Sequence, residues 1–156
     1  MRLPKRLFQF NKLINCFIIF RLFNFNCMTI FSKIIAGQIP AHILAESDQF
    51  IAFLDIAPVK KGHTLVVPKI ETDKLFDLPD EFLQGLLVFA KPIALALQKS
   101  FPCNRVSILT VGLDVPHAHL HLIPMDTTAD MNLHNKKLQF SPQEFNDIKA
   151  SILANM

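Results

Sequence analysis

Residues 115–124 read Val-Pro-His-Ala-His-Leu-His-Leu-Ile-Pro, and they hold three of the six histidines of the chain at a spacing of two. Successive side chains of a strand point to opposite faces, so the three imidazoles share one face, about 6.6 Å apart along the strand. Ala118, Leu120 and Leu122 then face the other side, toward a core. On a helix the three histidines would spread over different faces. The spacing therefore predicts a strand from His117 to Pro124.

Four more strands are expected around this one. Residues 42–46 and 50–55 are apolar and flank Ser47-Asp48-Gln49, which predicts a hairpin. Residues 63–68 form a β-branched run that ends at Pro68, and residues 105–110 form another apolar run. We therefore expect an antiparallel sheet of about five strands.

Three helices are expected outside the sheet. Residues 29–36 have helical spacing and are followed by Gly37. Residues 140–145 combine Ser141, Pro142 and Glu144 in the pattern of a capped helix start. Between them, apolar side chains step by four, three, four and four from residue 79 to residue 100: Phe82, Leu86, Phe89, Ile93 and Leu97. We expect Pro92 to kink this long helix. The fold class is α+β, with a long helix and a C-terminal helix.

Composition and charge limit the classes of protein to which this chain can belong. With 51% hydrophobic and 19% charged residues among 156, the chain has the composition of one globular domain. Its net charge of +3 arises in residues 1–27, which hold five basic residues and no acid, while the rest has eleven basic against thirteen acidic residues. We therefore expect no nucleic-acid partner. Apolar runs are too short to span a membrane, and three cysteines without close spacing favour a reducing, cytoplasmic location.

Residues 1–27 differ in composition from the remainder. They are rich in Phe and Asn, lack a clean secretory signal, and precede Met28, the first residue of a coherent pattern. We interpret them as an N-terminal extension that is either a mis-assigned start or disordered, in preference to an interfacial amphipathic anchor. Residues 28–156 are expected to form a single domain that folds and melts like the full chain.

The histidine face has three possible explanations. It could be a sheet surface that carries histidines without a function. It could bind a metal, with a third ligand from His63 or Asp114. It could perform phosphate chemistry, because a neutral imidazole is nucleophilic and its neighbours can donate hydrogen bonds.

The segment resembles the signature of the histidine-triad (HIT) family, in which histidines alternate with apolar residues. Three upstream segments are similar to other landmarks of that family, in the usual order: residues 30–40, 53–58 and 62–69. The resemblance extends from Thr29 to about Pro124. It implies a nucleotide-binding hydrolase or transferase that acts without a cofactor, usually as a homodimer.

The resemblance also implies roles for individual residues. His119 would attack the α-phosphorus of a purine nucleotide conjugate, and a nucleotidyl-histidine would form and be hydrolysed. His121 and His63 would contact the phosphate, and His117 would hold the local geometry. The nucleotide would be bound by Ile30, Phe31, Ile34, Phe53, Asp55, Ile56, Asp114 and Val115. Phe31 and Phe53 could instead be core aromatics, and Asp55 a turn residue.

Two departures from the family pattern bear on substrate and metal. Many members have Gly-Gln and then Ser, Thr or Glu before the triad, where this chain has Gly112-Leu113-Asp114. Some members begin with a zinc-binding Cys-x-x-Cys, where this chain has Thr29 and Ser32, so we expect no structural zinc.

The favoured substrates are nucleoside phosphoramidates or dinucleoside polyphosphates, cleaved at the α-phosphate. A metal-dependent enzyme and a nucleotide-binding regulator with vestigial activity are the alternatives.

Overall fold

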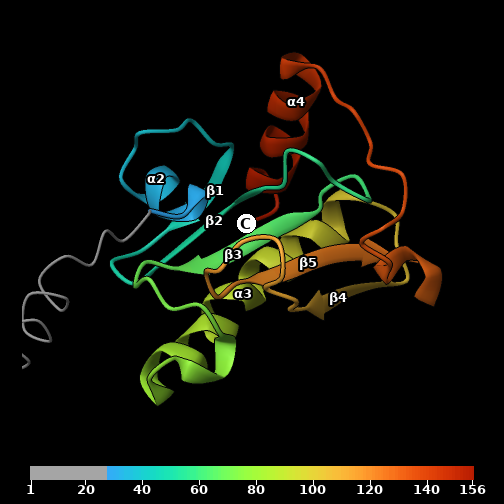
Figure 1. The fold of residues 1–156 in the computed structure, drawn as a ribbon. Helices are drawn as coiled ribbons and strands as arrows, with labels where there is room; N and C mark the ends of the chain where they lie inside the picture. The colour runs from blue at the N-terminus through green and yellow to red at the C-terminus, as the bar shows by residue number, and fades with distance from the viewer. Residues whose placement is uncertain (1–27) are drawn as a thin grey trace, which may run out of the picture.

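A computed structural model describes residues 28–156, which contain a five-stranded antiparallel sheet of order β1-β2-β3-β5-β4 (Figure 1). The expected extension at residues 1–27 lies outside the described residues. The α+β class and the strand number are confirmed. The strands are β1 (Ile43–Glu46), β2 (Phe50–Leu54), β3 (Thr64–Pro68), β4 (Arg105–Leu109) and β5 (Leu120–Met125). The helices are α2 (Ile30–Ile35), α3 (Asp80–Ser100) and α4 (Pro142–Leu153), with 3₁₀ turns η1 (Leu75–Asp77) and η2 (Thr128–Met131).

Helices pack on both faces of the sheet. One face contacts α3 and α4 through a core that includes Ala52, Val66 and Leu122. The other contacts α2 through a second cluster that includes Ile51 and Leu65. Because both faces are covered, every residue of β2 and β3 is buried, and these strands read as continuous apolar runs.

The predicted stripe of the long helix α3 faces the core. Leu86, Ile93 and Leu97 are fully inaccessible, and Phe82 and Phe89 are partly buried. It runs without interruption across Pro92. In residues 28–156 no helix is both long and apolar enough to cross a membrane.

The helix α4 starts as the sequence predicts. Ser141 Oγ accepts a hydrogen bond from the Glu144 amide, and the Glu144 carboxylate accepts one from the Ser141 amide. The rings of Phe140 and Phe145 meet edge to face at 5.5 Å, which supports the entry angle of this helix.

The predicted start of the histidine strand is wrong, because β5 begins at Leu120 and not at His117. The first pair between β3 and β5 joins Val66 to Leu120. Upstream of it the backbone turns: the His117 amide donates to the Val115 carbonyl at 2.8 Å. The Ala118 amide donates to the carbonyl of Thr72, outside the sheet. Only His121 of the three therefore lies within a strand.

Candidate active site

The sheet register builds the site from three strands. Phe53 of β2 pairs with Leu65 of β3, and Leu65 pairs with His121 of β5. These three residues form one row on the face that α2 covers. Two residues further along, past the ends of β2 and β3, Asp55 and His63 continue on the same face because strand side chains alternate. The Asp55 amide donates to the His63 carbonyl at 3.0 Å and keeps the two segments paired.

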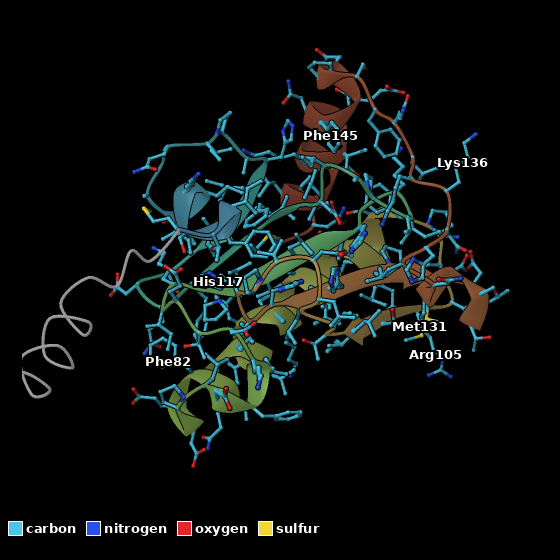
Figure 2. All side chains as sticks on the ribbon, in the orientation of Figure 1. Phe82, Arg105, His117, Met131, Lys136 and Phe145 are labelled. Atoms are coloured by element: carbon cyan, nitrogen blue, oxygen red, sulfur yellow. The ribbon has the colours of Figure 1, made fainter. Side chains whose placement is uncertain are left out.

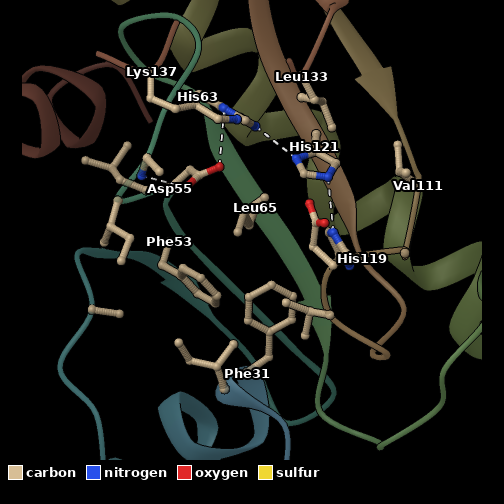
Figure 3. A pocket seen from close by; sticks show the side chains of 18 of the residues that line it. Phe31, Phe53, Asp55, His63, Leu65, Val111, His119, His121, Leu133 and Lys137 are labelled. Atoms are coloured by element: carbon tan, nitrogen blue, oxygen red, sulfur yellow. Dashed lines mark hydrogen bonds and ion pairs between the residues drawn. The ribbon is translucent and has the colours of Figure 1, made fainter. Parts of the chain in front are cut away.

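A cavity of about 300 Å³ opens in front of this row (Figure 3). Its walls include ten of the twelve site residues expected from the sequence: Ile30, Phe31, Phe53, Asp55, Ile56, His63, Asp114, Val115, His119 and His121. The other two do not line it. Ile34 packs in the α2-facing cluster, and His117 lies beside α2.

Three imidazoles form a hydrogen-bonded row along the cavity. His119 Nδ1 lies 2.6 Å from the His117 carbonyl, which can only accept, so Nδ1 carries the proton. In the neutral ring His119 Nε2 is then an acceptor, and it lies 3.1 Å from His121 Nε2, which donates. His121 Nδ1 in turn accepts from His63 Nε2 at 2.9 Å. His119 Nε2 therefore carries no proton, and its lone pair accepts the hydrogen bond from His121 Nε2–H.

Burial keeps these rings neutral. Desolvation lowers the pKa of His63 to about 4, although the carboxylate of Asp55 opposes this shift. Desolvation, followed by the charges of His119 and His63, lowers the pKa of His121 to about 3. The pKa of His119 is also lowered, chiefly by desolvation. At pH 7 all three are uncharged, as a nucleophile and hydrogen-bonding neighbours require.

The two carboxylate oxygens of Asp55 have different contacts, one within its own turn and one in the site. Its Oδ1 accepts from the Ala57 amide at 2.8 Å, as expected for a turn residue. Its Oδ2 lies 3.4 Å from His63 Nδ1 and faces the cavity.

His117 belongs to a separate polar cluster under α2. Its Nε2 donates to the Pro68 carbonyl at 2.9 Å, which leaves Nδ1 as an acceptor 3.0 Å from Thr29 Oγ1. Ser32 Oγ donates to Glu71 at 2.9 Å and lies 3.0 Å from Thr29 Oγ1. Thr29 and Ser32 are the positions where the family resemblance would place a cysteine pair, and hydroxyl hydrogen bonds link the elements there.

Three side chains of the site are of the kinds that bind metal ions and lie close together. The donor atoms of Asp55, His63 and His121 all fall within 4.8 Å of one another. The metal hypothesis placed two histidines of the strand with His63 or Asp114. The group contains His63 but only one of the three strand histidines, His121, and it does not contain Asp114.

Nine residues of the cavity wall are not among the twelve expected site residues: Ala41, Leu54, Ala57, Leu65, Val111, Gly112, Leu113, Leu133 and Lys137. Leu65 could have been found from the alternation that selects His63. No local pattern marks Leu133 or Lys137, because both lie in the irregular strap, which we define as residues 126–141 between β5 and α4.

Comparisons with known proteins cover most of the chain. The HIT domain family model matches residues 36–128. The adenosine 5′-monophosphoramidase HNT1 of Saccharomyces cerevisiae is 42% identical over 100 residues, which are 61% of this chain and 61% of the yeast protein. An uncharacterized HIT-like protein of Borreliella burgdorferi is 32% identical over 135 residues, 81% of this chain and 97% of that protein. A Hit-like protein of Bartonella henselae, described as involved in cell-cycle regulation, has a crystal structure that aligns with a TM-score of 0.71. The two are 29% identical, over 82% of this chain and 96% of that one.

Proposed function

Because this chain belongs to the HIT domain family, we propose that it is a nucleotide-binding hydrolase or transferase that cleaves a nucleotide conjugate at its α-phosphorus. The similarity to a yeast adenosine 5′-monophosphoramidase supports nucleoside phosphoramidates as one substrate class. Dinucleoside polyphosphates are the other class, because the same attack on the α-phosphorus would break their P–O bond in place of the P–N bond of a phosphoramidate.

The proposal rests on one observation: His119 lies in the cavity wall, and its unprotonated Nε2 faces a hydrogen-bond donor, His121 Nε2–H. In the first step this atom forms a bond to the α-phosphorus while the bond to the leaving group breaks. The leaving group keeps the electron pair and takes a proton from solvent. His121 Nε2–H, released from His119, donates a hydrogen bond to a phosphoryl oxygen.

In the second step water attacks the phosphorus, the nitrogen–phosphorus bond breaks, and the water proton passes to solvent. The products are a nucleoside monophosphate and the free imidazole. Splitting the displacement in two lowers the barrier of each step. The His117 carbonyl holds His119 Nδ1–H throughout and keeps Nε2 directed at the cavity.

The remaining wall fits a nucleoside. Phe31 and Phe53 lie edge to face at 5.7 Å and form an apolar slot for the base with Ile30. Asp55 Oδ2 is placed to accept hydrogen bonds from ribose hydroxyls.

The direct test is mass spectrometry of protein quenched during turnover of adenosine 5′-phosphoramidate. We expect an adenylyl group on His119, and loss of turnover with retained nucleotide binding in His119→Ala. His134→Ala is the matched control, because His134 is exposed in the strap. Tight binding with no product and no adduct would favour the regulator instead.

A metal-dependent hydrolase is the second candidate, and the donor group of Asp55, His63 and His121 favours it. Activity that falls on dialysis against a chelator and returns with Zn²⁺ would support it. Full activity after chelation would support the nucleotidyl-histidine route.

We also propose a homodimer. Leu87, Val88 and Leu95 on α3 and Ile108 on β4 are 49–73% exposed, and β4 is an edge strand. A second copy would cover this apolar surface and the edge. Sedimentation analysis should give a dimer for the unmutated protein and a monomer for Leu95→Glu, with Leu153→Glu on α4 unchanged.

A further inference from the structure

The cavity contains a charge that the proposed reaction has not used. Among its described wall residues, Lys137 is the one lysine or arginine, against the carboxylates of Asp55 and Asp114. Lys137 is therefore the one lysine or arginine of the described wall that can attract an anionic substrate.

The strap holds Lys137 at a defined place. The Leu138 amide donates to the Pro58 carbonyl at 2.8 Å, and Asp130 Oδ1 lies 3.3 Å from Lys60 Nζ. Both anchors are in the segment between β2 and β3 that also carries Asp55 and His63. The ammonium group of Lys137 has no carboxylate within 4.0 Å in the described part of the chain, so it is free to bind a ligand.

Lys137 lies at the end of the imidazole row opposite the nucleophile. Figure 3 shows Lys137 beside His63, with His121 between His63 and His119. In an in-line displacement the leaving group departs on the side of the phosphorus away from the attacking atom. A leaving group expelled by His119 thus moves away from His119 and toward the end of the cavity where Lys137 lies.

We propose that Lys137 is a specificity-determining residue that binds an anionic leaving group, such as the phosphate next to the α-phosphate of a dinucleoside polyphosphate. This inference rests on the proposed function. It selects polyphosphate conjugates over phosphoramidates, whose leaving group is a neutral amine. Lys137 lies beyond residue 128, where the family match ends, so the residue is not one that this match assigns.

The test compares two substrates in four proteins. The substrates are diadenosine triphosphate, which releases ADP, and adenosine 5′-phosphoramidate, which releases ammonia. The proteins are the unmutated chain, Lys137→Met, Lys137→Arg and Lys136→Met. Met keeps the aliphatic length without the charge, Arg keeps the charge, and Lys136 is absent from the cavity wall and points away from the body in Figure 2.

For Lys137→Met we expect kcat/KM on diadenosine triphosphate to fall about ten-fold, as for loss of a charge-assisted hydrogen bond. On the phosphoramidate it should change less than about three-fold. Lys137→Arg should recover most of the activity, and Lys136→Met should match the unmutated protein. Added salt should reduce the difference between the unmutated protein and Lys137→Met, because an exposed charge is screened.

Equal losses on both substrates, or no loss on either, would overturn the role of Lys137 while leaving the proposed function intact. Inactivity of the unmutated protein on both substrates would overturn the proposed function and, with it, the role of Lys137.

Discussion

The three evenly spaced histidines end in different surroundings. His121 pairs within the sheet, His119 bonds to the backbone at His117, and the His117 ring lies under α2. His119, whose Nδ1 faces the His117 carbonyl and whose Nε2 lies at the cavity wall, is the ring that we propose as the nucleophile. The His117 ring bonds to the Pro68 carbonyl and the Thr29 hydroxyl, and so connects α2 to the end of β3.

Thr29→Val tests this connection. Valine removes the hydroxyl that faces His117 Nδ1 and that accepts from the Ser32 amide at the start of α2. We expect the free energy of unfolding in urea to fall by about 1–2 kcal/mol, the usual range for loss of a cap or a buried hydrogen bond. Thr29→Ser retains the hydroxyl and should remain within about 0.5 kcal/mol of the parent. Equal stability of the Val and Ser variants would contradict the role of this hydroxyl.

At the scale of elements, the turn before β3 sets the position of His63. Gly62 has a φ of +84°, a region that favours glycine, and a Cβ built there would lie 2.7 Å from the Phe101 ring. Phe101 follows α3 and closes the core on that side. The contact between Gly62 and Phe101 thus connects the turn that precedes His63 to the end of the long helix.

Gly62→Ala should be strongly destabilising. We expect about 1–2 kcal/mol for the left-handed backbone and about 1–3 kcal/mol more for the contact with Phe101, measured by urea unfolding. Gly37→Ala separates the two causes, because Gly37 has a φ of +69° with no atom within 4 Å of the added Cβ. If both variants lose the same stability, packing against Phe101 contributes nothing.

For the whole molecule, the neutral imidazoles link stability to pH. The folded pKa values of His63 and His121, about 4 and about 3, lie below the unfolded value of 6.5. Between pH 6.5 and these values the unfolded chain binds protons that the folded chain does not, so stability falls as the pH falls.

We expect the free energy of unfolding to decrease from pH 6.5 toward pH 5, by up to about 1.4 kcal/mol per pH unit for each such histidine. His121→Asn, which removes one of the two, should show a shallower decrease over the same range. Urea titrations at half-unit steps would measure both slopes. A stability that stays constant from pH 7 to pH 5 in the unmutated protein would show that folding does not lower the pKa values of these rings.

Local patterns were sufficient for those features that depend on neighbours in the chain. The capped start of α4 at Ser141, the hairpin between β1 and β2, and the α3 stripe each follow from residues within a few positions of one another. The pairing of alternate residues also placed His119 and His121 together, and the family resemblance added Asp55 and His63.

Contacts between segments that are distant in the sequence could not be predicted from local patterns and were found only in the folded structure. Thr29 and His117 are 88 residues apart, and no sequence pattern near either residue predicts the hydrogen bond between them. The start of β5 was predicted too early because strand pairing depends on the partner strand, and none pairs with His117. Lys137 reaches the cavity because the strap is anchored at Pro58, across about eighty residues of sequence. Periodicity records which side chains share a face; only the packing of one element on another determines what that face meets.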